Sequence, residues 1–571
     1  MSVKKNTGID QESFDHTKYK AFKPVSLKDR TWPEQSITTA PLWCSVDLRD
    51  GNQALAQPMS VAKKLKMFKL LVKLGFKEIE IGFPSAAQTE FDFTRKLIEG
   101  NYIPDDVTIQ VLTQAREHLI QRSFEALEGA KRAIVHVYNS TSTVQRQQVF
   151  ARSKDDIASI AVQGARWVKD YAANYPQTEW AFQYSPESFT GTEMDYAARV
   201  CNDVINVWQP EKGQRVIINL PATVESSTPN VFADQIEYIC RHLQQREHII
   251  VSLHTHNDRG CGVAAAELGL MAGADRVEGT LLGNGERTGN MDIVTMAMNL
   301  YSQGINPQLD LHDMQEIIEV VKFCTQLPVH PRHPWAGELV YTAFSGSHQD
   351  AIRKSVSYHK ENNLEHWNVA YLPVNPADIG RRYEEIVRIN SQSGKGGVGL
   401  VLERDHGYDL PKWLLAEISQ QVQTTAEVSG EEVSSEKIKQ LFETQFMNIP
   451  NGWQLTGYKL HSENQQTIAQ FKIKKDNEVI ELMGHGQGAL EALVNALAQY
   501  LGLNIAVSEF DEHALTHETV SKALASIAVS VNDVSGLACA IDEDSTRANL
   551  QACLTAVGNL LDKHEALRKV V

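Results

Sequence analysis

Residues 248–258 read HIIVSLHTHND, an apolar run that ends in two histidines one residue apart. The apolar part has the length and composition of a buried strand. Side chains two residues apart on a strand point to the same side, so His254 and His256 can face one shared interior. Two hydrogen-bonded polar residues in a turn are the competing interpretation, and on this pair alone we favour it over a metal site.

Segments of the same strand-like kind recur along the chain and alternate with stretches of helical spacing, such as 60–75 and 233–245. Their number and period favour a closed (β/α)8 TIM barrel, in which catalytic groups gather at the carboxyl ends of the strands. A doubly wound open sheet is the alternative, because periodicity does not distinguish the two. The predicted strands are 43–48, 77–83, 107–113, 132–138, 180–185, 215–221, 248–254 and 276–283.

The regular alternation stops on both sides of the predicted catalytic barrel, residues 39–330. Residues 1–38 are polar and irregular, and we predict an N-terminal arm. Prolines cluster at the start of residues 331–437, which we predict to be linker subdomains. The last part of this region, 424–437, is polar and acidic, which is typical of a hinge or surface loop.

The remaining residues, 438–571, are predicted to form a small α+β domain. Residues 466–501 have the pattern of strand, strand, glycine turn and helix, and residues 525–561 repeat it with an acidic turn. We interpret this as a duplicated ββα unit. Such units commonly pair into ligand-binding or dimerising modules, which is an argument by analogy.

The bulk composition limits the classes of partner. A chain of 571 residues is expected to hold about two to four domains, and its formal net charge is −16. That charge argues against nonspecific binding to nucleic acid or to an acidic membrane surface. No apolar run reaches the ~20 residues of a membrane helix, and residues 1–20 lack the apolar core of a secretory signal. The seven cysteines form no CxxC pair, so we expect a cytoplasmic protein.

Side chains suited to a cation follow three of the predicted strands. The first strand continues into DLRDGNQ, where Asp50 supplies a carboxylate, and the eighth is followed by LLGNGERTGN, which ends at Asn290. Together with His254 and His256 they form a mixed nitrogen and oxygen set that suits a divalent ion. Two coordination positions would remain for a chelating substrate, so the predicted site is of the open, catalytic type.

Further polar side chains lie at the same predicted edge of the barrel. Arg49 precedes Asp50 and can stabilise negative charge on a carbonyl oxygen, although an ion pair at the barrel mouth explains most such arginines. The fourth, fifth and sixth strands add an imidazole, a carboxylate and two hydroxyls. A core histidine and a solvated loop acid are the ordinary alternatives for the first two. These candidates are His136, Glu187, Ser185 and Thr223.

Long motifs along nearly the whole chain resemble the 2-isopropylmalate synthase family. More broadly, they resemble the metal-dependent Claisen-condensing and aldol-cleaving barrels, which carry RDG on the first strand and HxH on the seventh. The motifs YSPESFTGTE and GNGERTGN are typical of the longer form of the family. The matching stretches are LWCSVDLRDGNQAL, FQYSPESFTGTE, NLPATVE, LHTHNDRGCGVA, GNGERTGN, SGSHQDAI and NSQSGKGG.

The resemblance implies that acetyl-CoA condenses with 2-oxoisovalerate to give 2-isopropylmalate and CoA, the first committed step of leucine biosynthesis. It implies a divalent cation, with Mg²⁺ expected before Mn²⁺ or Zn²⁺, and K⁺ as a candidate activator. It also implies a homodimer. The implied ligands of the cation are Asp50, His254, His256 and Asn290.

The resemblance also suggests a role for each of the other candidates. Arg49 would polarise the oxo-acid carbonyl, and Thr223 would bind the oxo-acid carboxylate. His136 and Ser185 would line the oxo-acid pocket. Glu187 and His348 match an acid–base pair, and Tyr371 matches a tyrosine beside them, although a tyrosine packed beside prolines is as good an explanation.

In the same family the C-terminal domain binds leucine, which inhibits the enzyme allosterically. A glycine-rich turn there commonly reads GxGNGP, and this chain keeps its glycines as Gly484, Gly486 and Gly488. Gln487 replaces the Asn and Ala489 replaces the Pro. A tight turn without any ligand would explain the three glycines equally well.

Three other interpretations stay open at this point. A homocitrate or citramalate synthase would share the barrel and differ in its oxo acid. A metal-dependent lyase would share the barrel and the cation, but the long C-terminal domain argues against it. A non-catalytic amino-acid sensor would keep an inactive barrel, which the full set of expected ligand and acid–base residues makes the least favoured.

Overall fold

The computed structural model describes residues 16–210, 215–343, 345–385, 395–429, 433–448, 453–463, 466–475, 478–515 and 522–563. They belong to two compact units. The first comprises Met1–Val340 with Val374–Arg382, and the second comprises Tyr341–Pro373 with Tyr383–Val571. Within the described ranges, no helix combines the length and hydropathy needed to span a lipid bilayer.

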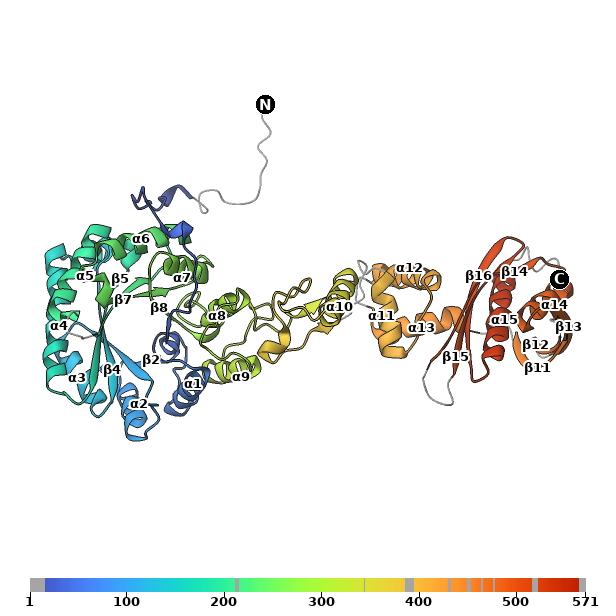
Figure 1. The fold of residues 1–571 in the computed structure, drawn as a ribbon, viewed down its shortest axis with the longest axis horizontal. Helices are drawn as coiled ribbons and strands as arrows, with labels where there is room; N and C mark the ends of the chain where they lie inside the picture. The colour runs from blue at the N-terminus through green and yellow to red at the C-terminus, as the bar shows by residue number, and fades with distance from the viewer. Residues whose placement is uncertain are drawn as a thin grey trace, which may run out of the picture. The chain divides into compact units, whose positions relative to one another are not determined.

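The first unit contains a closed barrel of eight parallel strands in sequence order, which confirms the predicted TIM barrel and excludes the open sheet (Figure 1). The barrel closes where the first strand pairs with the last, with Leu42 opposite Arg276. The strands are β1 Leu42–Ser45, β2 Glu78–Gly82, β3 Thr108–Gln114, β4 Arg132–Ser140, β5 Glu179–Glu187, β6 Arg215–Ala222, β7 Ile249–Thr255 and β8 Arg276–Gly279.

Helices cover the outside of this barrel. The first one shows why they form, because Ser60 caps its N-terminus, Gly75 ends it with a left-handed φ of 101°, and residues such as Phe68 and Leu71 bury one face. The helices are α1 Val61–Leu74, α2 Gln88–Glu99, α3 Glu117–Leu127, α4 Lys154–Ala173, α5 Met194–Trp208, α6 Pro229–His242, α7 Gly262–Met271, α8 Ile293–Ser302 and α9 Met314–Thr325.

Two predicted strands are too long. The strand predicted at 43–48 ends at Ser45, and Asp47–Gly51 form a π-helical turn instead. The carbonyl of Val46 accepts hydrogen bonds from the backbone of Arg49, Asp50 and Gly51, which reverses the chain there. Likewise β8 ends at Gly279, before the 3-10 turn Leu281–Gly283. Buried apolar residues in these turns resemble strand residues in the sequence.

The barrel interior carries a polar network next to a small apolar cluster of Ile134, Ala181 and Ile217, which point to the same side as His136, Gln183 and Asn219 two residues later. In β2, Glu78 and Glu80 alternate with Ile79 and Ile81, and all four are buried. The glutamates make their ion pairs to barrel residues such as Arg276, so the carboxylates point inward and the isoleucines point toward the helices. The barrel therefore holds a network of charges where a TIM barrel usually packs branched apolar side chains.

The described part of the predicted N-terminal arm lies against α6. Arg30 makes two hydrogen bonds to the carboxylate of Asp234, at 2.8 and 2.9 Å, and Trp32 Nε1 donates to the same group. The backbone nitrogen and hydroxyl of Thr31 donate to Glu237. Both acids are buried, so these bonds attach the irregular segment firmly to the first unit.

The second unit begins with helices. They are α10 Gly346–Glu361, α11 Lys395–His406, α12 Lys412–Ser429 and α13 Ser435–Phe442, and β9 Thr342–Ala343 pairs with β10 Glu384–Glu385. The hinge or loop predicted at 424–437 is wrong for 424–429 and 435–437, which are helical. A buried row explains α12, because Leu414, Ile418, Val422 and Ala426 recur every fourth residue.

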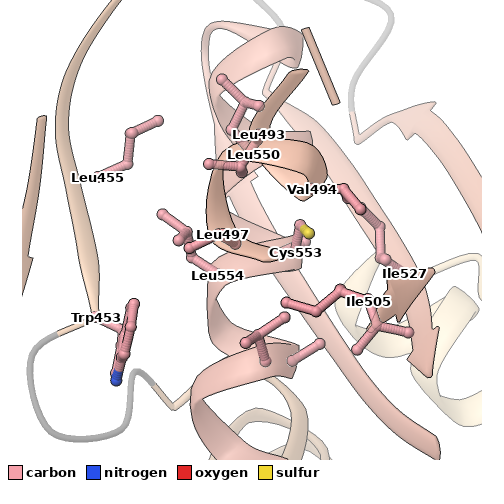
Figure 2. Packing of buried hydrophobic residues seen from close by; sticks show 14 of the residues in the cluster. Trp453, Leu455, Leu493, Val494, Leu497, Ile505, Ile527, Leu550, Cys553 and Leu554 are labelled. Atoms are coloured by element: carbon pink, nitrogen blue, oxygen red, sulfur yellow. The ribbon is translucent and has the colours of Figure 1, made fainter. Parts of the chain in front are cut away.

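The C-terminal part repeats a βββα unit, one strand longer than the predicted ββα. The unpredicted strands expose most of their residues, so they lack the alternating apolar pattern. The two helices and both sheets share one apolar core, shown in Figure 2 around Leu497 and Leu554. The elements are β11 Gln454–Glu463, β12 Gln466–Lys475, β13 Glu478–Gly486, α14 Ala489–Leu501, β14 Ile505–Ala514, β15 Ala523–Val531, β16 Val534–Asp542 and α15 Ser545–Lys563.

The glycines at the end of β13 let this strand approach α14 closely. A Cβ on Gly484 would lie 1.9 Å from the carbonyl oxygen of Ala492, and one on Gly486 would lie 2.7 Å from the nitrogen of Ala492. A Cβ on Gly488 would meet no heavy atom within 4 Å. Close packing therefore accounts for the first two glycines but leaves the third unexplained.

We expect Gly484→Ala to destabilise the second unit, because the added methyl group collides with backbone. Overpacking of this kind costs about 1–3 kcal/mol, so the midpoint of guanidinium unfolding followed by circular dichroism should fall. Gly457→Ala is the matched control, since a Cβ there meets nothing within 4 Å. Equal midpoints for the two variants would contradict the packing role of Gly484.

Candidate active site

Three of the predicted metal ligands lie together at the carboxyl ends of β1 and β7. One ligand atom from each of Asp50, His254 and His256 lies within 4.8 Å of the other two, and all three residues are buried. Asp50 Oδ2 is 3.2 Å from His254 Nε2 and 3.6 Å from His256 Nε2. Both imidazoles therefore direct Nε2 toward the same carboxylate oxygen.

The loop after β8 places the fourth predicted ligand beside this group. Asn290 pairs with His256 in an isolated antiparallel bridge, and the nitrogen of Met291 donates to the carbonyl of Thr255 at 2.8 Å. The loop needs Gly289, whose φ is 98° and whose Cβ would lie 1.9 Å from the carbonyl oxygen of Gly283.

Asn290 faces the cluster with its amide nitrogen. Nδ2 donates to Asp50 Oδ2 at 2.7 Å and lies 3.3 Å from His254 Nε2. Oδ1 is buried and has no hydrogen-bond partner among the described residues. The predicted ligand was the oxygen. An amide donates to a neighbouring carboxylate, and a half-turn of the same group would present its oxygen to a cation.

The electrostatics of the cluster are those of a cation site. Burial lowers the pKa of His254, but hydrogen bonds to Asp50 and Glu278 outweigh it and raise that pKa to about 9. Burial, and then the charge of His254, lower the pKa of His256 to about 4. Burial opposes ionisation of Asp50, yet Arg49 and His254 hold its pKa well below the usual range. Asp50 is therefore ionised, and both Arg49 and His254 face its carboxylate.

The donor set fits a divalent metal ion. A carboxylate suits Mg²⁺ and Mn²⁺, and imidazoles suit Zn²⁺ and other first-row transition metal ions, so the mixed set does not select one ion. Glu278 accepts a hydrogen bond from His254 Nδ1 at 2.8 Å, which leaves Nε2 for the metal. A carboxylate behind a ligating histidine is a recurrent feature of metal sites. Asp50, His254, His256 and a turned Asn290 would hold the ion.

Arg49 lies next to the cluster and is anchored by two acids. Its Nη1 donates to Asp50 Oδ1 at 2.7 Å, and its Nε donates to Glu80 Oε2 at 2.5 Å. Glu80 also lies 2.7 Å from His136 Nδ1, and His136 Nε2 lies 2.7 Å from Ser185 Oγ. A single chain of contacts therefore joins the predicted carbonyl-polarising arginine to the predicted oxo-acid pocket.

Arg276 supports the other side of the cluster from deeper in the barrel. It is fully buried and donates to Glu278 at 2.8 Å, Glu78 at 2.6 Å and Gln110 at 2.9 Å. Gln183 and Asn219 also donate to Glu278. With so many donors, Glu278 stays ionised despite its burial, and its pKa lies well below the usual range.

A pocket of about 680 Å³, its open mouth included, brings most of the predicted residues of the first unit together. Glu187 lines it and accepts a hydrogen bond from Ser140. Thr223 lines it too, and its hydroxyl accepts from the nitrogen of Ser188 at 2.9 Å while its own hydrogen can still donate. The predicted residues along the wall are Arg49, Asp50, His136, Ser185, Glu187, Thr223, His254 and His256.

The two remaining catalytic candidates belong to the second unit. The ring of His348 stacks on that of Tyr371, with 4.2 Å between the ring centroids. Both residues are exposed, and Tyr371 has a left-handed φ of 63°. Their participation in the acid–base chemistry stays a prediction.

Sequence reasoning missed the residues that support the cluster and part of its wall. Glu80 and Glu278 were passed over as members of strands, although a charged residue inside a buried barrel strand is a usable signal. Several of the missed wall residues lie within the motifs NLPATVE and GNGERTGN, so the motifs carried a signal, but only the closed barrel shows which of their side chains face the pocket. The missed residues include Leu112, Tyr138, Asn219, Pro221, Glu286 and Arg287.

A second pocket lies in the second unit, between α14, β14 and α15. Gly488 lines it, whereas Gly484 and Gly486 do not. Its wall is largely apolar, with Val494, Val507, Phe510 and Leu550, and carries a few polar groups such as Asn549 and Thr546. An apolar wall with a few polar groups suits a small amphipathic ligand.

Three family models match successive parts of the chain, and curated relatives match nearly its whole length. Residues 40–321 match a family model described as HMGL-like, residues 338–403 match one described as alpha-isopropylmalate synthase, post-catalytic domain-like, and residues 432–561 match the LeuA allosteric (dimerisation) domain. The 2-isopropylmalate synthase of Alcanivorax borkumensis is 56% identical over 97% of this chain and 99% of its own length. That of Pseudomonas savastanoi pv. phaseolicola is 51% identical over 96% and 98%, and that of Clostridium acetobutylicum is 50% identical over 95% and 99%.

We expect Asp50→Asn to weaken Mn²⁺ binding by more than the roughly 10–100-fold loss that follows removal of an outer-shell partner. The variant keeps the volume of the side chain but removes the only carboxylate of the triad. Free Mn²⁺ measured by electron paramagnetic resonance reports the affinity directly. Asp106→Asn, at an exposed carboxylate, is the control, and an Asp50→Asn protein that binds like the control would rule out this cation site.

Proposed function

The chain belongs to the 2-isopropylmalate synthase family, and from that premise we propose that it condenses acetyl-CoA with 2-oxoisovalerate and releases 2-isopropylmalate and CoA. Members of the family are acyltransferases that convert the acyl group to an alkyl group on transfer, EC 2.3.3.13, and act in leucine biosynthesis. The observation that carries the proposal is the triad of Asp50, His254 and His256 beside Arg49 in a single pocket.

The condensation needs stabilisation of negative charge. The acetyl methyl group loses a proton, its carbon bonds to C2 of the oxo acid, and the C2 oxygen becomes an alkoxide that takes up a proton. Water then cleaves the thioester and frees CoA. A bound divalent cation would supply Lewis-acid stabilisation of that oxygen. Each preorganised electrostatic donor of this kind is typically worth ~3–4 kcal/mol in the barrier.

The residues of the pocket suit the remaining tasks. Arg49 is held rigidly by Asp50 and Glu80 and can donate to the developing alkoxide. Thr223 can donate its hydroxyl hydrogen to the substrate carboxylate. Glu187 lines the same pocket and is our candidate for removing the methyl proton. His348 is our candidate for its acid–base partner, by resemblance alone.

The wall of the pocket supports the choice of oxo acid. Leu112 and Pro221 are both buried residues of the wall, and they offer an apolar surface for a branched alkyl group. Arg287 also lines the pocket, and its Nε and Nη2 already donate to Asp258 and to the carbonyl of Thr223, so two of its three nitrogens are engaged before any substrate carboxylate binds. Both features favour 2-oxoisovalerate over 2-oxoglutarate, the acid that a homocitrate synthase would use.

We expect CoA release from acetyl-CoA to require both 2-oxoisovalerate and a divalent cation. The value of kcat/KM for 2-oxoisovalerate should exceed that for pyruvate by at least about tenfold, because 2-oxoisovalerate carries two more methyl groups and even one methylene in an apolar pocket is worth about 10–200-fold. A thiol-detection assay over 2-oxoisovalerate, 2-oxobutanoate, pyruvate and 2-oxoglutarate measures this. Strict preference for pyruvate or 2-oxoglutarate would refute the assignment.

We also propose that leucine is the allosteric inhibitor and binds in the second pocket. Its apolar side chain would lie against Val494, Val507 and Phe510. The N-terminus of α14 begins directly after Gly488 and favours a carboxylate, while Glu491 lies in the same wall and favours an ammonium group. A homodimer, a cytoplasmic location, and activation by K⁺ stay predictions.

We expect Gly488→Leu to raise the leucine concentration for half inhibition by about tenfold or more, which corresponds to about 1.4 kcal/mol of lost binding. The backbone at Gly488 is extended, with a φ of −146°, so a side chain is tolerated and would fill the pocket. Initial rates over a leucine titration give the shift. Gly457→Leu, another glycine with open space around its Cβ but outside the pocket, is the matched control. Equal inhibition of the two variants would place the leucine site elsewhere.

A further inference from the structure

The two metal-site histidines differ in what their second nitrogen meets. His254 Nδ1 has a carboxylate partner, Glu278 Oε2, at 2.8 Å. His256 is 5% exposed, and its Nδ1 is buried without a hydrogen-bond partner among the described residues. A ligating imidazole almost always donates its other N–H, because that bond fixes its tautomer and its orientation. The partner of His256 Nδ1 is therefore the missing part of this site.

Glu225 is a buried acid with one oxygen in use and one unused. It is 6% exposed, and its Oε2 accepts from the backbone nitrogen of Arg259 at 2.6 Å and from that of Cys261 at 3.4 Å. Its own nitrogen donates to Asp258 Oδ2 at 2.8 Å. Glu225 is thus tied twice to the turn that directly follows His256, and its position is fixed relative to that histidine.

The second oxygen, Glu225 Oε1, is buried and has no hydrogen-bond partner among the described residues. A buried carboxylate oxygen left unpaired is strongly unfavourable, because it loses its bonds to water and gains none in the protein. The proposed reaction gives Glu225 no role, and Glu225 does not line the substrate pocket. Its burial needs another explanation.

Both unpaired atoms belong to residues that line one small cavity, and His256 lines the substrate pocket as well. Thr190, Ala222, Thr255 and Phe232 also line this cavity, which connects the ends of β6 and β7. Its volume is about 10 Å³. That is the size that holds a single water, and a polar site with a donor and an acceptor is where buried water is found.

We propose that Glu225 is a positioning residue for His256 and acts through one water held in this cavity. His256 Nδ1–H donates to the water oxygen, and the water donates to Glu225 Oε1. The bridge keeps the proton on Nδ1 and leaves Nε2 free to face the cation, as Glu278 does for His254. The inference rests on the proposed function, because it assumes that His256 is a metal ligand.

The test is the affinity of the full-length protein for Mn²⁺, measured by electron paramagnetic resonance in Glu225→Gln. Glutamine keeps an oxygen for the nitrogens of Arg259 and Cys261 but replaces the anionic oxygen on the cavity side. We expect Mn²⁺ binding to weaken about tenfold or more, the lower end for an outer-shell partner. The melting temperature of the metal-free variant should stay near that of the wild type. Glu247→Gln, whose side chain is 73% exposed, is the matched control.

The outcomes separate this inference from the function on which it rests. Mn²⁺ affinity of Glu225→Gln within twofold of the control, with Asp50→Asn still defective, would overturn the role of Glu225 alone. A wild-type protein that binds no Mn²⁺ would overturn both. If Glu225→Gln does not fold, a crystal structure of the wild type at about 1.5 Å decides, because a water within hydrogen-bonding distance of both His256 Nδ1 and Glu225 Oε1 supports the bridge and its absence refutes it.

Discussion

The site depends on one physical constraint, that charges buried inside the barrel must be paired. A continuous chain of opposite charges runs through the interior, and each contact in it is between 2.5 and 3.2 Å. An isolated buried charge costs many kcal/mol, whereas removal of one partner from a buried pair costs about 3–5 kcal/mol. No member can therefore move without cost to its neighbours. In order, the chain is Arg276, Glu278, His254, Asp50, Arg49 and Glu80.

Because of this constraint, a single buried acid can hold several functional side chains in place. Glu80 anchors both Arg49 and His136, so the group that would polarise the substrate and the wall that would receive it keep a fixed separation. Glu278 anchors both His254 and Arg276, which ties this histidine to the buried arginine inside the barrel. Preorganisation of this kind is what electrostatic catalysis requires, because groups that are already oriented need no reorganisation in the transition state. The two carboxylates that face His254, Asp50 and Glu278, raise its pKa to about 9 despite its burial.

In the second unit, glycines within a single turn are present for different structural reasons. Gly484 and Gly486 allow β13 to pack against α14, whereas Gly488 stands in open space at the pocket. A family pattern that contains all three glycines therefore does not have a single structural cause, because close packing explains the first two and not the third. The replacements at Gln487 and Ala489 lie between and after these glycines, where the packing role of the first two is unaffected.

The sequence by itself predicted the barrel, and it predicted which polar side chains gather at the strand ends, because period, motif spacing and side-chain chemistry are local properties of the chain. It also indicated Arg49, Glu187 and Thr223, which stand next to recognisable strand ends. The tertiary structure alone decided which strand acids support them, how far β1 and β8 extend, that α12 continues through a polar stretch, and that β11 and β14 exist. The physical reason is that partners such as Glu80 and His136, or Glu225 and His256, are distant in sequence and meet only when parallel strands close into a cylinder.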